Sequence, residues 1–251
     1  MDLLTTGLRG QKALVTGAAS GIGKATSLML AQAGVQLAML DVNTSALQES
    51  AAECEAFGPS ALSLAVDLVD LEAAERAFGC AVAKLGGIDI LVNSAGYVGA
   101  SSKLLEAQIE DLRRVQTINV EAPIVLMKAF AEHAIARGRG GRIINVGSSS
   151  AFHVSGKLGY SFTKAALITA SRFAARELGP HEITVNAVAP GVTRTPFFGG
   201  NPDAATKSGP LANYLGRAAE PEDVAAVILF LCTPAARQMT GQTLHTSAGS
   251  V

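Results

Sequence analysis

The stretch Lys12-Ala-Leu-Val-Thr-Gly-Ala-Ala-Ser-Gly-Ile-Gly23 joins a short apolar run to a helical pattern through a glycine-rich turn. Its first five residues have the continuous apolar character of a strand that is buried on both faces of a parallel sheet. Gly17, Gly21 and Gly23 lack a Cβ, so the backbone can turn sharply, approach a pyrophosphate and pack closely. A helix that begins here would offer its free N–H groups to phosphate oxygens. The stretch therefore predicts a dinucleotide-binding turn.

The same alternation of short apolar runs and longer amphipathic stretches continues along the chain. The runs with strand character are Lys12–Thr16, Gln36–Leu40, Ala61–Val66, Ile88–Val92, Arg142–Val146, Thr184–Ala189 and Gln242–Thr246. The helical patterns are Gly21–Ala33, Thr44–Phe57, Leu71–Leu85, Ser102–Ala136, Tyr160–Leu178 and Pro221–Leu231. This order predicts a single α/β domain over residues 1–251, with a Rossmann-type, doubly wound parallel sheet of about seven strands and helices on both faces. The irregular stretch 196–215 is expected to be a substrate loop.

Composition excludes several other classes of protein. The chain has 251 residues, of which 49% are apolar and 16% are charged, so disorder is excluded. A net charge of −1 argues against nucleic-acid binding. Three scattered cysteines and four histidines without ligand spacing predict neither a disulfide framework nor a metal site. No apolar run reaches the roughly 18 residues of a membrane span and no signal peptide is evident, so we expect a cytoplasmic protein without a membrane partner.

Asp41 follows the second strand, eighteen residues after Gly23. A carboxylate at this place binds the ribose hydroxyls of an adenosine and repels a 2′-phosphate. Ser20 stands in the turn where a cationic residue would favour that phosphate, and Val42 and Asn43 follow Asp41. The sequence therefore favours NAD over NADP, although Asp41 also fits an ordinary turn residue.

Tyr160 and Lys164 are four residues apart and share one face of a predicted helix. A phenol has an unperturbed pKa of about 10, and a nearby ammonium would favour the phenolate. Ser148 ends the fifth strand, where active sites of parallel sheets lie, and it could hold the same substrate oxygen. Asn119 lies inside a helical pattern, a position that often marks a kink or a water site. The alternative is that Tyr160 and Lys164 are an ordinary pair on the surface of a helix with no catalytic role. A serine hydrolase is excluded because no Gly-x-Ser-x-Gly elbow surrounds Ser148.

These motifs together resemble the short-chain dehydrogenases/reductases in their compact single-domain form. The resemblance covers Gly10 to Gly249. It is carried by the turn 16–23, Asn93-Ser94-Ala95-Gly96, Asn119, Ser148, Tyr160-x-x-x-Lys164 and Pro190-Gly191-x-x-x-Thr195. The sequence departs from the family pattern at Ser94, at Ser247-Ala248, and in a Ser148–Tyr160 interval that is about one residue short.

The resemblance implies a role for each matching residue. Tyr160 would be the general acid and base, Ser148 would hold the substrate oxygen, Lys164 would bind the nicotinamide ribose and lower the tyrosine pKa, and Asn119 would hold a water of a proton relay. Contacts with the cofactor, NAD, are implied for Gly17, Ser20, Gly21, Ile22, Gly23, Asp41, Asp67, Leu68, Asn93, Ala95, Gly96, Tyr160, Lys164, Pro190, Gly191, Val192 and Thr195. Substrate contacts are implied for Ser148, Phe152, His153, Val154, Tyr160 and Phe197.

The expected activity is an NAD-dependent interconversion of a secondary alcohol and a ketone. The substrate is expected to be small to medium in size and hydrophobic, because the implied pocket is mostly apolar and no Arg or Lys is placed by pattern to bind a carboxylate. Two alternatives remain: an NADPH-dependent 3-oxoacyl thioester reductase, and a non-catalytic dinucleotide-binding sensor, which would be expected to lack the tyrosine or the lysine. The resemblance also implies a homotetramer in which the helices of Ser102–Ala136 and Tyr160–Leu178 pair between subunits.

Overall fold

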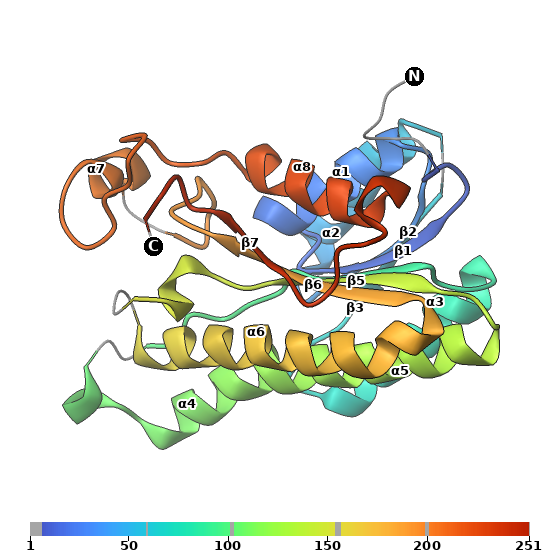
Figure 1. Ribbon diagram of the computed structural model, residues 1–251, viewed down its shortest axis with the longest axis horizontal. Coiled ribbons are helices and arrows are strands. Elements are labelled where there is room, and N and C mark those ends of the chain that lie inside the picture. The colour runs from blue at the N-terminus through green and yellow to red at the C-terminus, as the bar shows by residue number, and fades with distance from the viewer. Residues whose placement is uncertain (1–6, 59, 101–102, 154–156, 199–200, 251) are drawn as a thin grey trace.

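The computed structural model describes residues 7–58, 60–100, 103–153, 157–198 and 201–250. Seven strands form one sheet in the order β3-β2-β1-β4-β5-β6-β7, and every neighbouring pair is parallel (Figure 1). The strands are β1 (Lys12–Thr16), β2 (Gln36–Asp41), β3 (Ala61–Ala65), β4 (Ile90–Asn93), β5 (Gly141–Val146), β6 (Ile183–Pro190) and β7 (Thr243–Thr246). Every residue of β4 and β6 is buried, as the apolar runs predicted. The predicted single-domain, doubly wound sheet is confirmed.

Helices cover both faces of the sheet and enclose two apolar cores (Figure 1). One face carries α1 (Gly21–Gln32), α2 (Thr44–Glu55) and α8 (Pro221–Cys232), and the other carries α3 (Leu71–Leu85), α5 (Ala122–Ala136) and α6 (Leu158–Leu178). Leu30, Leu47 and Ile228 pack in the first core, while Phe78 and Phe130 pack in the second. The two helical layers hold the sheet rigid, so the loops at its edge start from fixed positions.

The strand order reverses between β1 and β4, and this reversal positions the functional edge of the sheet. Loops after neighbouring strands diverge at such a point and leave a crevice at the carboxyl ends of the strands. The Thr16 hydroxyl oxygen accepts hydrogen bonds from the backbone N–H groups of Ser94 and Ala95, each at 3.1 Å. This side chain therefore ties the glycine-rich turn after β1 to the loop after β4.

The predicted helical stretch Ser102–Ala136 is broken in the structure, so the expectation of one continuous pattern is wrong. From residue 103 onward it consists of a short 3₁₀ turn (Leu104–Glu106), α4 (Ile109–Gln116), a π-helical turn (Thr117–Glu121) and α5; Ser102 lies outside the described residues. Pro123 has no N–H, so it removes the donor that an α-helix would aim at the Asn119 carbonyl. The chain widens into a π turn there, a feature that often occurs at functional sites.

The loop 196–215 is also more regular than the sequence predicted. It contains α7 (Pro202–Lys207), which projects beside the C-terminal segment at one end of the molecule (Figure 1). The Asn201 side chain accepts a hydrogen bond from the Ala204 N–H at 3.1 Å, and Pro202 suits the first helical turn. Residues 199 and 200 lie outside the described residues.

Neither a membrane span nor a metal cluster is found where the structure is described. No helix there is both long enough and apolar enough to cross a membrane. No group of three or more His, Cys, Asp or Glu residues could hold a metal ion in the same part of the chain. All three cysteines are free, and burial raises the thiol pKa of Cys54 to about 11 and that of Cys232 to about 12.

Candidate active site

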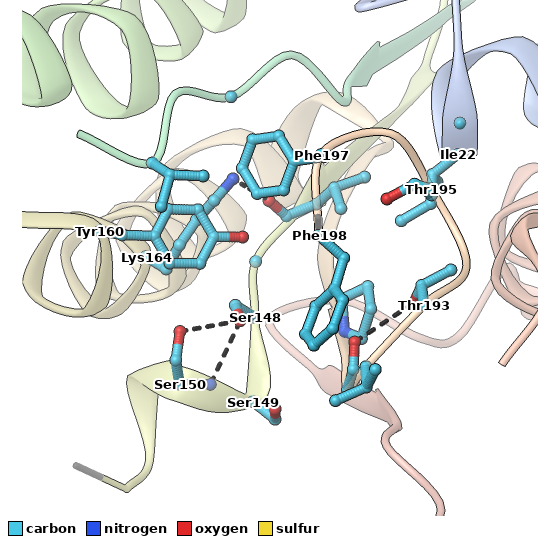
Figure 2. A pocket seen from close by; sticks show the side chains of 18 of the residues that line it. Ile22, Ser148, Ser149, Ser150, Tyr160, Lys164, Thr193, Thr195, Phe197 and Phe198 are labelled. Atoms are coloured by element: carbon cyan, nitrogen blue, oxygen red, sulfur yellow. Dashed lines mark hydrogen bonds between the residues drawn. The ribbon is translucent and has the colours of Figure 1, made fainter. Parts of the chain in front are cut away.

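A cleft of about 330 Å³ opens at the carboxyl ends of the central strands. Residues from six separate segments converge on it, and Figure 2 shows Tyr160 and Lys164 on one side of Ser148, with Phe198 and Thr193 on the other. The lining residues are Ser20, Gly21, Ile22, Ser94, Gly96, Val98, Val146–Ser150, Lys157, Tyr160, Lys164, Pro190–Thr193, Thr195, Phe197, Phe198 and Leu211. The cleft thus lies where the reversal of strand order places a ligand site.

The glycine-rich turn forms one end of the cleft and leaves no room for side chains. Gly17 has a φ of +68°, and a Cβ there would lie 2.9 Å from Ala95 Cα. A Cβ on Gly23 would lie 2.1 Å from the Gly17 carbonyl oxygen. The Ser20 side chain makes no capping hydrogen bond, so the first N–H groups of α1 keep their capacity for an anion. These residues fit the pyrophosphate of a dinucleotide.

Asp41 lies at the end of β2, beside the same turn. One carboxylate oxygen accepts a hydrogen bond from the Ala19 N–H at 3.1 Å, and the other accepts one from the Asn43 N–H at 2.9 Å. A carboxylate can accept about four hydrogen bonds, so each oxygen keeps capacity for a ribose hydroxyl. Asp41 therefore both shapes the turn and offers acceptors next to it.

Lys164 and Tyr160 come from the first two turns of α6. Lys164 is 2% exposed, and its ammonium donates a hydrogen bond to the Val146 carbonyl at 2.7 Å. The Lys164 Nζ lies 5.5 Å from the centre of the Tyr160 ring. Burial lowers the pKa of Lys164 to about 8.

The pKa of Tyr160 differs from the expectation that Lys164 lowers it. Burial raises this pKa to about 12, and the nearby Ser148 hydroxyl acts in the opposite direction. The Lys164 ammonium lies over the Tyr160 ring and not beside the phenol oxygen. Burial also lowers the pKa of Lys164, so Lys164 holds its own proton less tightly. The phenol of the protein alone is therefore protonated at neutral pH, ready to act as an acid.

Ser148 lies between the end of β5 and α6, close to Tyr160. It is 9% exposed, and its oxygen accepts hydrogen bonds from the Ser150 N–H at 3.2 Å and from the Ser150 hydroxyl at 2.8 Å (Figure 2). Because both bonds use its lone pairs, the Ser148 proton remains to be donated to a substrate oxygen.

Asn119 lies behind the cleft, in the π turn. Its side-chain oxygen accepts a hydrogen bond from the Tyr97 N–H at 2.8 Å, and its amide donates to the Tyr97 carbonyl at 2.9 Å and to the Thr163 hydroxyl at 3.0 Å. The side chain is fully buried and satisfied. Any water that Asn119 binds would therefore be held by its backbone carbonyl.

Comparison with known proteins identifies the family. The model of a family described as enoyl-(acyl carrier protein) reductase matches residues 17–250. L-xylulose reductase of Mus musculus is 37% identical over 252 residues, which cover 99% of this chain and 98% of the relative. The sorbitol dehydrogenase of Cereibacter sphaeroides is 34% identical over 255 residues, covering 97% and 98%. The chain belongs to the short-chain dehydrogenase/reductase family.

Solved structures of this family superpose closely. A short-chain type dehydrogenase/reductase from Mycobacterium marinum gives a TM-score of 0.91 at 32% identity and covers 100% of this chain and 98% of its own. One from Mycobacterium paratuberculosis, bound to NAD, gives 0.89 at 30% identity, covering 97% and 98%. One from Burkholderia cenocepacia, in complex with NADP, gives 0.89 at 35% identity, with the same coverage. Family membership makes this chain an oxidoreductase of CH–OH groups that uses a nicotinamide dinucleotide.

The structure brings most of the cofactor residues expected of a short-chain dehydrogenase/reductase into the cleft. Those in the lining are Ser20, Gly21, Ile22, Gly96, Tyr160, Lys164, Pro190, Gly191, Val192 and Thr195; those outside it are Gly17, Gly23, Asp41, Asp67, Leu68, Asn93 and Ala95. The Leu68 side chain is buried in the second core, and the Asn93 amide donates to Asn145 at 2.8 Å. Exposed Asp67 accepts a hydrogen bond from the Val69 N–H at 3.0 Å. The Leu68 side chain and the Asn93 amide nitrogen are therefore used inside the fold, and cofactor contacts at these two residues stay predictions.

The expected substrate residues divide in the same way. Ser148, Tyr160 and Phe197 line the cleft, and the rings of Tyr160 and Phe197 lie 5.6 Å apart. Phe152 does not line it, because its ring packs against His245 with centres 4.6 Å apart. His153 is also outside the lining, and Val154 lies outside the described residues.

Sequence reasoning missed Lys157 and Leu211, which both line the cleft. Lys157 is the residue immediately before α6 and precedes Tyr160 by three residues. Its closeness in sequence to Tyr160 was a usable signal. The expectation that no Arg or Lys is placed by pattern to bind a carboxylate stays a prediction, because lining the cleft does not show what Lys157 binds. Leu211 belongs to the irregular part of the loop, where no periodic pattern predicts direction.

Arg194 does not line the cleft but links the substrate loop to the segment before α8 through ion pairs, an arrangement that we call the Arg194 clasp. Its guanidinium donates to both carboxylate oxygens of Asp203 on α7, at 3.0 and 3.1 Å, and to Glu220 before α8 at 2.9 Å. The Arg194 N–H also donates to the Ala219 carbonyl at 2.8 Å. The clasp holds the segment between Thr193 and Thr195, two lining residues, and leaves the Arg194 charge neutralised.

Proposed function

We propose that this protein interconverts a secondary alcohol and a ketone with NAD(H), and that Tyr160 is its general acid and base. The observation that carries this proposal is that Tyr160, Ser148 and Lys164 meet in one cleft that ends at the glycine-rich turn. Val98, Phe197 and other apolar lining residues support a small-to-medium substrate with a hydrophobic body.

The residues of the chain would divide the chemistry between them. The nicotinamide of a bound cofactor would supply the redox chemistry, as the acceptor of the carbinol hydride in oxidation and its source in reduction. In oxidation, Ser148 holds the substrate oxygen by donating a hydrogen bond, and the Tyr160 phenolate takes the hydroxyl proton as the carbonyl forms. That proton then passes to solvent, so the alcohol loses one hydride and one proton. In reduction, the Tyr160 phenol gives the proton to the same oxygen.

Other parts of the chain would hold the cofactor and return the proton to solvent. The turn from Gly17 to Gly23 would bind the pyrophosphate, with Asp41 and Asp67 toward the adenosine and 190–195 along the nicotinamide. Lys164 would bind the ribose next to that ring. The backbone carbonyl of Asn119 would hold the relay water, because Pro123 removes its α-helical donor.

The raised Tyr160 pKa predicts opposite pH dependences for the two directions. Oxidation needs the phenolate, so its rate should rise about tenfold per pH unit from pH 6 until the apparent pKa of the cofactor complex is reached. Reduction needs the phenol, so its rate should be flat over that range and fall above the apparent pKa. Initial rates in both directions from pH 6 to 10 test this; an oxidation rate that falls with pH would contradict the assignment of Tyr160 as the base.

NAD preference rests on the charges near the adenosine end. Asp41 presents a carboxylate beside the turn, and Lys24, the first cation after the turn, donates to Glu53 at 2.7 Å. A 2′-phosphate would therefore meet a negative group and find Lys24 already paired. Solved relatives include one bound to NAD and one in complex with NADP, so the family accommodates both.

The function and the cofactor are tested together by absorbance of the reduced nicotinamide, with NAD and NADP in parallel across a panel of secondary alcohols. We expect turnover with NAD. In the variant Asp41→Ala, kcat/KM for NAD should fall about tenfold or more, and that for NADP should change little or rise, because the 2′-phosphate is no longer repelled. The quantity to compare is the ratio of kcat/KM for NAD to kcat/KM for NADP, because loss of the hydrogen bonds from Ala19 and Asn43 would weaken the binding of both cofactors alike. Equal losses would show that Asp41 only shapes the turn.

A second candidate function is reduction of a 3-oxoacyl thioester. The 3-oxoacyl-(acyl-carrier-protein) reductase of Thermotoga maritima is 34% identical over 245 residues. Strong preference for NADPH with a 3-oxoacyl thioester in the same assay would favour it over our proposal. A non-catalytic sensor is disfavoured because Ser148, Tyr160 and Lys164 are all present and adjacent.

Self-association is a further part of the proposal. Phe173 on α6 is 71% exposed, and Ile124 and Ile135 on α5 are 43% and 41% exposed. Exposed apolar side chains on these two helices support the homotetramer that the resemblance implies.

A further inference from the structure

We propose that Lys157 binds an anionic end of the substrate, so that the enzyme acts on a hydroxy acid or keto acid whose carboxylate lies several bonds from the reacting carbon. This inference rests on the proposed function and specifies its substrate class. Lys157 would be a specificity-determining residue, because the apolar walls of the cleft alone would select only for the hydrophobic part of a substrate.

Lys157 is positioned by the same helix as the reacting groups. It is the residue immediately before α6, in extended conformation, and it lines the cleft with Tyr160 and Lys164. Its ammonium donates a hydrogen bond to the Ala100 carbonyl at 2.5 Å, across from α6 in the loop after β4. This bond holds the charge between two walls of the cleft.

The charge of Lys157 has no partner carboxylate. Among the described residues, the charged members of the lining are Lys157 and Lys164, and no Asp or Glu oxygen lies within 4.0 Å of the Lys157 ammonium. The nearby segments outside the described residues, 101–102 and 154–156, contain only Ser, Val and Gly. On the Ala100 side, the Asp111 carboxylate is engaged by the Ala100 N–H at 2.8 Å. The partly exposed Lys157 ammonium therefore forms no ion pair with a described residue and keeps its charge for an anionic ligand.

The other cations near the cleft are already engaged. Lys164 is buried beside Tyr160 and donates to the Val146 carbonyl. Arg194 is paired with both Asp203 and Glu220. Lys157 also donates to a carbonyl, but it is not buried beside Tyr160 as Lys164 is and has no carboxylate partner as Arg194 has. Among the described lining residues it is therefore the cation available to a substrate group.

The hydrogen-bonding capacity of Lys157 favours a carboxylate over a phosphate. An ammonium has three N–H donors, and one is used by Ala100, so two remain. Two donors and one charge match a monoanionic carboxylate, whereas a phosphate with up to two charges normally draws several cations or backbone donors.

The position of Lys157 just before α6 limits the length of the substrate. Lys157 precedes Tyr160 by three residues, so their two Cα atoms can be separated by at most about 11 Å. The carboxylate and the reacting carbon would therefore be separated by a short hydrocarbon chain. Val98, Phe197 and Leu211 in the lining suit that chain.

Binding in the presence of NAD⁺ tests the inference without turnover, because oxidised cofactor does not reduce a ketone. Calorimetric titration would compare 4-oxopentanoate and 6-oxoheptanoate with their methyl esters. In the natural protein, at least one acid should bind about 10- to 100-fold more tightly than its ester, the range expected for a hydrogen bond to a charged group. The acid-to-ester ratio should fall to near one in Lys157→Met and persist in Lys157→Arg. Lys84→Met, an exposed position on α3 outside the cleft, is the matched control.

The ratio separates an anion-binding role from a structural one. If Lys157 only tethers Ala100, Lys157→Met weakens the acid and the ester equally. Equal binding of acid and ester to the natural protein at both chain lengths, or a preference that survives in Lys157→Met, would overturn the inference. Failure of the proposed chemistry is recognised separately, by full turnover in a Tyr160→Phe variant.

Discussion

Replacing Tyr160 by Phe should lower kcat in both directions by about 100- to 10,000-fold, the range that general acid–base catalysis contributes. The substitution removes only the phenol oxygen and keeps the ring that packs 5.6 Å from Phe197. The other hydroxyls of the described lining belong to serine and threonine side chains, which are aliphatic alcohols and far weaker acids than a phenol. The Lys164 ammonium is held by the Val146 carbonyl at 2.7 Å, so the proton at the substrate oxygen would have to come from a less well placed donor.

The affinity for the dinucleotide should change only a few-fold in Tyr160→Phe, because the turn, Asp41 and Lys164 remain. Fluorescence titration with NADH measures that affinity, and initial rates measure kcat. Tyr214→Phe is the matched control: this side chain is 89% exposed, and we expect its loss of a hydroxyl to leave kcat unchanged. A Tyr160→Phe enzyme that keeps more than a tenth of the natural turnover would refute the assigned role.

Gly23→Ala should nearly abolish dinucleotide binding and also destabilise the fold. The added Cβ would lie 2.1 Å from the Gly17 carbonyl oxygen and 2.7 Å from its carbonyl carbon, so the backbone of the turn must move. Overpacking against fixed backbone costs about 1–3 kcal/mol in the free energy of unfolding. Such a movement displaces Gly17, which itself packs against Ala95, and so disturbs both ends of the phosphate site.

Gly79→Ala is the matched control for this substitution. Gly79 lies inside α3, and a Cβ there would meet no heavy atom within 4 Å. The same chemical change should therefore raise the free energy of unfolding by about 0.5–1 kcal/mol, since Ala favours a helix over Gly. Thermal unfolding and NADH titration of both variants give the comparison. A Gly23→Ala protein with natural affinity for NADH would show that the close approach in the turn is not required.

The order of apolar runs was enough to predict the sheet, because its strands are buried on both faces and therefore carry a continuous signal. Breaks in helices were harder to predict. The π turn at Asn119 depends on the missing N–H of Pro123, an effect that a search for apolar periodicity does not detect. Likewise, α7 is too short for a periodic pattern, and its start depends on the Asn201 cap.

In the site, residues that act through their type and spacing were predictable, whereas side-chain direction was not. Gly21, Ser148, Tyr160 and Lys164 all line the cleft, as expected from strand ends and helical spacing. Phe152 was expected in the same cleft, but its ring packs against His245 of β7, which is 93 residues away in sequence. Contacts between segments so far apart leave no local trace in a single sequence.

The Arg194 clasp gives the two halves of the cleft different sensitivities to dissolved salt. The carboxylates of Asp203 and Glu220 and the guanidinium are all partly exposed, so mobile ions screen their attraction. The dinucleotide half is instead fixed by short-range bonds such as those of the Thr16 hydroxyl to Ser94 and Ala95, which are 3.1 Å long and depend little on ionic strength. Rising salt should therefore loosen the attachment of α7 to Arg194 more than the glycine-rich turn. We expect the ionic composition of the surrounding fluid to affect the substrate loop before it affects the pyrophosphate end of the cleft.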